Sequence, residues 1–221
     1  MTSATKALVL DFGGPVLLTP FELVEESPGT PAHSLLSRRG PMAPDAEPDP
    51  DWLALQAGQI TERDYWDHRS AEWSDLGGGS KAEPSIQHMM AQLYEPARPA
   101  LVRPVALAAI RAARAAGHRV GVLTNDLSAF HSAKWIAAMD VLREIDVIVD
   151  GSVEGYLKPD PRLYELMAER LGVAFDDMVF VDDQASNVRG AEALGIPTVH
   201  LDPRDPETAY AQARKLLGLE D

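Results

Sequence analysis

The hydrophobic positions near the N-terminus and throughout the C-terminal half follow two periods that alternate along the chain. Short, nearly continuous apolar runs are typical of strands buried on both faces of a sheet, and stretches with helical spacing separate them. The predicted strands are residues 6–10, 118–126, 145–151, 178–183 and 197–202, and the predicted helices are residues 100–117, 128–139, 161–171, 185–195 and 207–217. This alternation predicts an α/β fold with a parallel sheet and helices on both of its faces.

Polar side chains gather where these predicted strands end. Asp11 ends the first strand, Thr124, Asn125 and Asp126 end the second, and Asp182 with Asp183 ends the fourth. Parallel sheets bind their ligands at the carboxyl ends of the strands, so these groups are candidates for a functional site. Some of them can equally serve as helix caps.

Residues 18–97 interrupt the alternation between the first strand and the first long helix. Residues 28–51 are rich in proline and charge, which predicts loop for part of the segment. Residues 53–73 have helical character on both sides of Gly58, and Thr61 opens a T-x-x-D helix-start pattern. We therefore expect a catalytic core of residues 1–17 and 98–221 with a helical cap domain inserted as residues 18–97.

The composition narrows the choice of partner. The 221 residues carry a formal net charge of −14, which argues against nucleic acid or an anionic membrane as the partner. An anionic substrate would need a metal ion or a local basic group to reverse the field at its site. The absence of cysteine excludes disulfides and thiol catalysis and fits a cytoplasmic location. We see no signal peptide and no run long enough to span a membrane.

Four short motifs occur in order along the chain: "LVLDFGG", "VLTND", "LKPDPRLY" and "VFVDDQASN". Together they resemble the haloacid dehalogenase superfamily of hydrolases, and the branch with a helical cap inserted after the first motif in particular. The stretch "GQITERDYW" is similar to a segment often found in caps of that branch. The resemblance implies a Rossmann-like core and hydrolysis through a covalent intermediate on an aspartate.

The resemblance implies a role for each motif residue. Asp11 corresponds to the nucleophile, and Lys158 to the lysine that bridges nucleophile and phosphate. Thr124 and Asn125 fall in the motif that holds the phosphoryl group, although Thr-Asn after a strand is also common turn chemistry. Phosphoryl transfer depends mainly on positioning and on positive charge around the phosphate oxygens, which supports a role for the lysine.

The same resemblance implies a magnesium site. Asp11, the carbonyl of Gly13 and Asp183 would bind Mg²⁺, which favours one or two carboxylates together with waters and phosphate oxygens. Asp182 would lie beside the metal or reach it through water, or merely cap the following helix. Asn187 would orient the lysine or the metal-bound waters, or belong to the helix surface.

Gly13 departs from the usual pattern of the superfamily, in which the residue two after the nucleophile is an aspartate that serves as general acid and base. Gly13 keeps the backbone carbonyl and loses the carboxyl group, whose help is typically worth about 10²–10⁴ in rate. Three consequences are open: turnover restricted to good leaving groups, a proton donor supplied by another group such as one from the cap, or ligand binding without turnover.

Three functions follow. The leading hypothesis is a Mg²⁺-dependent phosphatase for a small phosphorylated metabolite, with no nucleic acid or membrane partner and an open oligomeric state. The second is a metal-free 2-haloacid dehalogenase, in which Arg38 or Arg39 would receive the halide. The third is a phosphate-binding protein with weak or no turnover. Further cap residues that could line a substrate pocket are Arg63, His68, Arg69, Trp66 and Trp73.

Overall fold

A computed structural model describes residues 5–95 and 101–219 of the chain. Its centre is a five-stranded parallel sheet with the order β3-β2-β1-β4-β5. The strands are β1 (Ala7–Leu10), β2 (Arg119–Thr124), β3 (Val147–Asp150), β4 (Met178–Asp182) and β5 (Thr198–His200). All five fall within the strands predicted from the apolar runs, so the α/β parallel sheet is confirmed.

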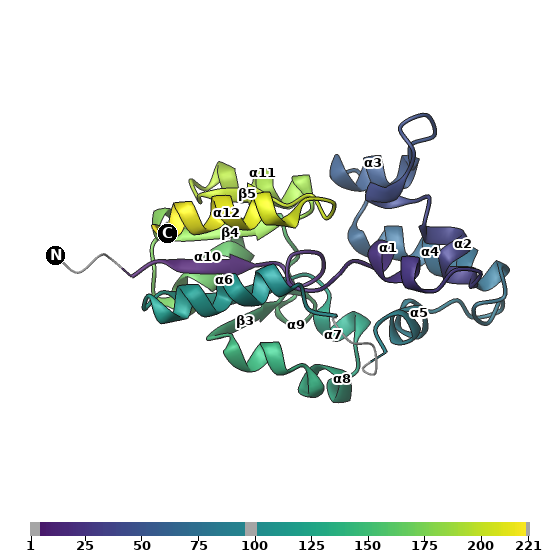
Figure 1. Cartoon of the computed structure of the whole chain (residues 1–221), viewed down its shortest axis with the longest axis horizontal. Coiled ribbons are helices and arrows are strands. Elements are labelled where there is room, and N and C mark those ends of the chain that lie inside the picture. Colours follow the sequence, from purple (N-terminus) through teal and green to yellow (C-terminus); the bar gives the residue numbers. More distant parts are fainter. Residues whose placement is uncertain (1–4, 96–100, 220–221) are drawn as a thin grey trace.

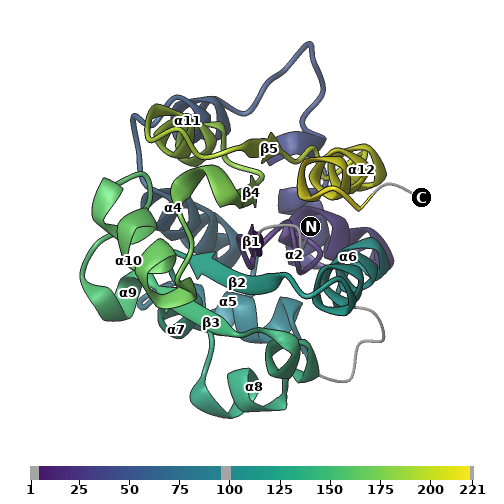
Figure 2. The same cartoon turned by 90° about the vertical axis from the view of Figure 1, so that its left-hand side faces the viewer.

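Two layers of helices cover the sheet, as the view along the strands in Figure 2 shows. One face carries α6 (Pro104–Ala115) and α12 (Pro206–Leu217), and the other carries α10 (Pro161–Leu171) and α11 (Ala185–Ala193). The strands alternate their side chains between these layers. Towards α6 and α12 point Leu8, Leu10, Val120, Val122, Val179 and Val181, and towards α10 and α11 point Ala7, Val9, Leu123, Val149, Met178 and Phe180. Burial on both faces explains why each strand reads as a continuous apolar run.

The helices between β1 and α6 lie beyond one end of the sheet (Figure 1). They are α1 (Pro20–Leu23), α2 (Pro31–Leu36), α3 (Pro50–Gln56), α4 (Glu62–Asp75) and α5 (Ile86–Leu93), with short 3-10 helices at Val24–Glu26 and Gly40–Met42. An aromatic cluster holds them together. The Phe21 ring lies 5.5 Å from both the Trp52 and the Trp66 ring, centroid to centroid, and Tyr65 lies 5.2 Å from Trp66. Their apolar core is continuous with the core under α6 and α12.

Several predicted boundaries were wrong in detail. The expected helix at residues 100–117 begins at Pro104, because Arg103 has an extended backbone and Pro104 occupies the first helical position. Its expected start at residue 100 lies outside the described residues. The expected helix at 128–139 is two short helices, α7 (Leu127–Phe130) and α8 (Ala133–Ala138). His131 is extended between them, and the Ser132 side chain caps α8 by accepting from the backbone of Trp135.

The segment at residues 28–51 contains more helix than its composition suggested. Thr30 and Asp49 each cap a helix that begins with proline, α2 at Pro31 and α3 at Pro50. Proline is well suited to the first helical position, which has no need of a backbone N–H donor. The helical character on both sides of Gly58 is confirmed by α3 and α4. In the described part of the chain, we find no helix with the length and hydrophobicity needed to cross a bilayer.

Candidate active site

Three carboxylates meet at the carboxyl ends of the two central strands. Asp11 follows β1, while Asp182 ends β4 and Asp183 follows it. Each offers an oxygen that lies within 4.8 Å of an oxygen of the other two, and all three residues are buried. Adjacent parallel strands in register bring the ends of β1 and β4 together, since Leu10 pairs with Val181. The sequence prediction that these acids share one edge of the sheet is therefore supported by their geometry.

One buried cation stands among these acids. The Lys158 ammonium group donates to Asp11 Oδ1 at 2.8 Å and to Asp182 Oδ2 at 2.7 Å. Burial by itself would lower the pKa of this group, but the charges of the two aspartates raise it above its ordinary value, so Lys158 is a fixed positive charge. Asn125 holds its backbone, accepting from the Lys158 N–H at 2.7 Å and donating to its carbonyl at 3.3 Å.

Asp182 is occupied by contacts within the protein. Besides Lys158, its carboxylate accepts from the backbone N–H of Gln184 at 2.8 Å and from the Asn187 amide at 3.1 Å. Asp182 thus binds the backbone of Gln184, the N-cap residue of α11, and also holds the lysine, a contact that the sequence analysis did not predict. Asn187 contacts the lysine's partner and is buried, so it does not belong to the helix surface.

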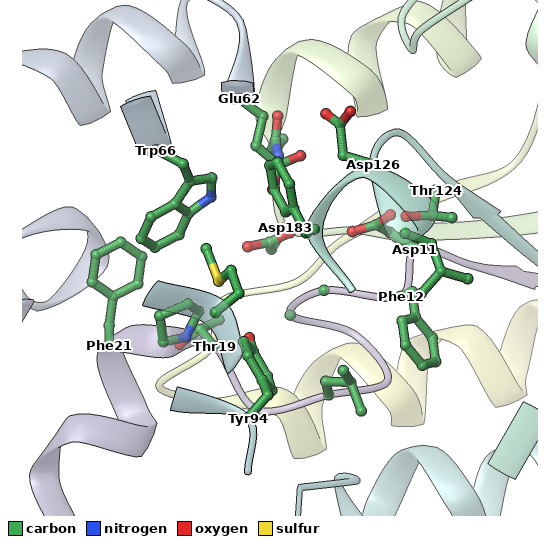
Figure 3. Close-up of a pocket in the computed structure, with 18 of the residues that line it drawn as sticks. Asp11, Phe12, Thr19, Phe21, Glu62, Trp66, Tyr94, Thr124, Asp126 and Asp183 are labelled. Carbon is green, nitrogen blue, oxygen red and sulfur yellow. The ribbon is translucent and has the colours of Figure 1, made fainter. Parts of the chain in front are cut away.

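Asp183 differs from its neighbour in its surroundings. Its backbone carbonyl accepts from Gln56 Nε2 at 3.4 Å and lies 3.0 Å from His200 Nε2, which fixes the main chain. Its carboxylate faces the pocket of Figure 3 near Asp11. Burial, followed by the charges of Asp182 and Asp11, raises the pKa of the Asp183 carboxyl group well above its usual value.

The donor set fits a hard divalent cation. The site holds three buried carboxylates, and the Lys158 ammonium pairs with two of them. Burial, and then the charges of Asp182 and Asp11, raise the pKa of Asp183. Asp11 and Asp183 are the two of these that line the pocket, together with Gly13. One or two carboxylates with room for water and phosphate oxygens are what Mg²⁺ requires. These residues would hold the ion, in agreement with the set expected from the sequence.

The loop after β1 is shaped around Asp183. Gly14 has a φ of +90°, and a Cβ built on it would lie 2.6 Å from Asp183 Cγ. At Gly13 φ is not positive, and an added Cβ would come no closer than 3.9 Å to Asp11 Oδ2. The backbone of Gly14 therefore packs directly on the carboxylate, whereas the place of the missing side chain at Gly13 is open.

Gly14→Ala is expected to destabilise the protein by about 1–3 kcal/mol, because alanine must adopt a left-handed conformation and displace Asp183. The thermal stabilisation by MgCl₂ should fall with it, since Asp183 moves. Gly13→Ala is the matched control and is expected to cost less than about 1 kcal/mol. Equal losses of unfolding free energy in the two variants, with the MgCl₂ effect unchanged, would contradict this account.

A pocket opens from this cluster towards helices α1, α3, α4 and α5 (Figure 3). Thr124, the last residue of β2, lines it together with Asp11, Asp183 and Glu62. Its remaining wall is mostly apolar and aromatic: Phe12, Leu17, Pro20, Phe21, Trp52, Leu55, Trp66, Met90, Tyr94, Leu127 and Phe130. Lys and Arg do not occur among the described residues that line it.

Helices α3 and α4 are tied to the core around this pocket. Arg63 forms an ion pair with Asp126 of the loop after β2. The side-chain oxygen of Gln56 accepts from the backbone N–H of Ala185 at 2.7 Å, and the backbone carbonyl of Gln56 accepts from the Arg189 guanidinium at 2.7 Å. Sequence reasoning missed Gln56 and Glu62. The segment "GQITERDYW" pointed to a cap, but an acid after a helix cap is common, and only the folded chain places it over the site.

The other cap residues considered from the sequence are divided between surface and interior. Arg38 and Arg39 lie 3.7 Å from Glu47 and Glu72 and line a separate surface cavity, so they do not face the active-site pocket. His68 is exposed and contacts Asp51. Arg69 is only 3% exposed and pairs with the buried Asp49. Trp73 is buried in the cap, and Trp66 alone of the two tryptophans lines the pocket.

Comparison with known proteins gives the class. The model of the haloacid dehalogenase-like hydrolase family matches residues 44–195. The chain belongs to this family and is a hydrolase of the haloacid dehalogenase type, as its four motifs and its fold indicated.

Two of the curated relatives are named as phosphatases. The chain is 36% identical over 150 residues to Phosphatase MT3486 of Mycobacterium tuberculosis, covering 66% of this chain and 64% of the relative. It is 28% identical over 220 residues to Acyl-CoA dehydrogenase family member 10 of Mus musculus, covering 96% of this chain but 19% of that protein. A 116-residue stretch is 31% identical to phosphoglycolate phosphatase of Escherichia coli, covering 48% and 46%. The chain thus spans less than two thirds of the length of each of these relatives.

Solved structures agree on the fold. A dehalogenase structure superposes with a TM-score of 0.62 at 19% identity over the full length of both chains. The HAD phosphatase from Thermococcus onnurineus gives 0.60 at 21% identity, covering 98% of this chain and 99% of that one. At such identities the likeness concerns the fold, and the choice between phosphatase and dehalogenase depends on the site itself.

Proposed function

We propose that the protein is a Mg²⁺-dependent phosphatase that hydrolyses a phosphate monoester with an apolar body through a phosphorylated Asp11. The observation that carries the proposal is the charge of the site. Asp11, Asp182 and Asp183 converge within 4.8 Å around the single ammonium of Lys158. A site with this excess of negative charge binds a dianionic phosphate only together with a divalent cation.

The chain's own residues would divide the work as follows. Asp11 attacks phosphorus and carries the phosphoryl group until water removes it. Lys158 holds Asp11 in place and offers positive charge to the phosphate, and Thr124 lines the phosphate end of the pocket. Mg²⁺ held by Asp11, Asp183 and the Gly13 carbonyl would supply the further positive charge that the phosphoryl oxygens need. Residues 18–97 would act as the cap that excludes water.

Dehalogenation fits the pocket less well. A 2-haloacid is an anion and releases a second anion, so its site needs positive charge both for the carboxylate and for the halide. The described pocket lining has no lysine or arginine, so the positive charge near it is that of Lys158, which Asp11 and Asp182 already share and which could serve one anion but not two. Arg38 and Arg39 line a different cavity. Burial lowers the pKa of His131 to about 4, so this residue of the pocket adds no charge near neutral pH. Halide release in EDTA is nevertheless the outcome that would favour this second function.

The aromatic wall supports an apolar substrate body. Phe21 and Trp66 stand across the pocket from the carboxylates (Figure 3), and Trp52 lines the same pocket. Such rings bury apolar surface well and offer no positive charge to a second anionic group. An aryl or alkyl phosphate therefore suits the pocket better than a phosphate that also carries a carboxylate.

A comparison of p-nitrophenyl, hexyl and carboxymethyl phosphates, each with MgCl₂ or EDTA, tests the function. We expect Mg²⁺-dependent phosphate release, with kcat/KM for hexyl phosphate at least about tenfold above that for the carboxylated ester. 2-Chloropropionate with EDTA serves as the parallel substrate for dehalogenation. Chloride release there without phosphate release from any ester, or phosphate release that is indifferent to EDTA, would contradict the proposal.

A further inference from the structure

The departing oxygen of a phosphate ester needs a proton unless it is a weak base. The residue that would usually provide it is absent at Gly13, where an added Cβ would meet only open space and Asp11 Oδ2 at 3.9 Å. Efficient hydrolysis of an alkyl phosphate therefore requires another proton donor within reach of Asp11. The titratable side chains that line the pocket are Asp11, Glu62, Tyr94, Asp126, His131 and Asp183.

Most of these groups are engaged in other ways. Asp11 is the nucleophile, and Asp183 belongs to the metal site. Asp126 is paired with Arg63. The Tyr94 hydroxyl donates to the Leu18 carbonyl at 2.9 Å, and the His131 ring is stacked on Trp135 at 3.9 Å between centroids. Glu62 is the carboxyl group that remains.

Local structure directs Glu62 into the pocket. It is the first residue of α4, directly after Thr61, whose side chain accepts from the backbone of Asp64 in a capping box. The next residue, Arg63, ties this turn to the core through Asp126. Figure 3 shows the Glu62 side chain reaching towards Asp183 between Trp66 and Asp126. The start of α4 is thus fixed, and the carboxyl group faces the catalytic acids from the cap side.

We propose that Glu62 is the general acid and base of this hydrolase, in the place of the carboxyl group that Gly13 lacks. The inference rests on the proposed phosphatase function and names a further catalytic residue for it. The proton donor would then arrive with the cap, so that leaving-group protonation depends on cap and core being together. An acid between Asp183 and Trp66 would also lie near the ester oxygen of a substrate whose apolar body packs among the pocket aromatics.

Burial and the acids that face Glu62 favour its protonated form. The titratable and charged groups around it are Asp11 after β1, Tyr94 after α5, Asp126 after β2, Lys158 before α10 and Asp183 after β4, and the Gln184 side chain lies beside them. Burial, then the charges of Asp11 and Asp126, raise the pKa of Glu62 to about 8, while Lys158 and Gln184 lower it. The helix dipole at the start of α4 favours the carboxylate, but burial and the two aspartate charges outweigh it. Near neutral pH Glu62 thus holds a proton to give.

The two chemical steps balance with this one group. In the first, Asp11 forms a bond to phosphorus, and the bond from phosphorus to the ester oxygen breaks with its electron pair on that oxygen. The oxygen takes the proton of Glu62 and leaves as an alcohol. In the second, Glu62 takes a proton from a water molecule that attacks phosphorus, and Asp11 leaves as a carboxylate. Phosphate departs, and Glu62 is protonated again.

The test compares leaving groups in Glu62→Gln, an isosteric variant that cannot give a proton. We expect kcat/KM for hexyl phosphate to fall by about 10² or more, because without a proton from Glu62 the leaving group is hexoxide, a strong base. For p-nitrophenyl phosphate, whose leaving group is a weak base, we expect a loss below about threefold. In the wild type, kcat/KM for hexyl phosphate should fall as the pH rises through the pKa of Glu62, and Glu62→Gln should lack this limb.

Two further variants keep the result interpretable. Glu62→Asp retains a proton on a shorter side chain and should show a smaller but still selective loss. Asp67→Asn removes an exposed charge from the same helix and should leave kcat/KM for both substrates unchanged. Equal losses for both substrates in Glu62→Gln, or no loss for either, would overturn the assignment of Glu62. A wild type that hydrolyses neither ester would instead contradict the phosphatase function itself.

Discussion

Asp11→Asn is expected to lower Mg²⁺-dependent phosphate release from p-nitrophenyl phosphate by about 10⁴-fold or more, because the amide cannot form the covalent intermediate. The variant should fold, since Lys158 keeps Asp182 as a partner at 2.7 Å. Burial raises the pKa of Asp11 to about 6, so its charge disfavours the folded state above that pH. In the absence of metal we therefore expect the unfolding free energy at pH 8 to be no lower than in the wild type.

Asp176→Asn is the matched control for this variant. Asp176 is exposed and precedes β4 at the opposite end of the strand from the site. Its replacement should leave both the rate of phosphate release and the free energy of unfolding unchanged. An Asp11→Asn protein that folds and keeps a tenth or so of the wild-type kcat/KM would exclude Asp11 as the nucleophile.

Lys158→Met is expected to be the most destabilising change at the site, by about 3–5 kcal/mol, because it leaves two buried carboxylates without their shared cation. Phosphate release should be lost as well, since Lys158 holds Asp11 Oδ1 at 2.8 Å. Chemical denaturation of the variant and the wild type measures the first effect. Lys134→Met, at an exposed position on α8, is the control for loss of a lysine.

The pH dependence of this loss has a definite sign. Burial raises the folded-state pKa of Asp11 above its unfolded value, and loss of Lys158, whose charge lowers it, raises it further, so folding favours the protonated form. The stability of the variant is then higher at low pH and is lost as the pH rises through that raised pKa. We expect a smaller destabilisation at about pH 5 than at about pH 8. The opposite order would mean that this carboxylate is solvated rather than buried.

The sheet was predictable from the sequence because its strands are buried on both faces. Such strands appear in the sequence as apolar runs, and their alternation with helices predicted that the sheet is parallel. The break at His131 was not found, because the short run up to Ala138 keeps a helical composition, and only the capping contact from Ser132 to Trp135 shows where α8 begins. Helices α2 and α3 were hidden in a segment whose prolines stand at first helical positions.

The site was predictable as far as each residue ends a strand or precedes a helix. Asp11, Thr124, Lys158 and Asp183 do, and the fold brings them to one edge of the sheet. The role of Glu62 could not be predicted from the sequence, since it depends on where α4 lies against the loops after β2 and β4. Nor did the sequence predict the contact between Asp182 and Lys158, because the two residues come together only when the chain is folded.

Mass spectrometry of the protein, acid-quenched during turnover of p-nitrophenyl phosphate with MgCl₂, tests the central claim most directly. A covalent phosphoryl group on the peptide that contains Asp11 is the predicted result, and it should be absent in Asp11→Asn. Turnover that proceeds with the same peptide unmodified at every quench time, or with the phosphoryl group on another residue, would contradict it.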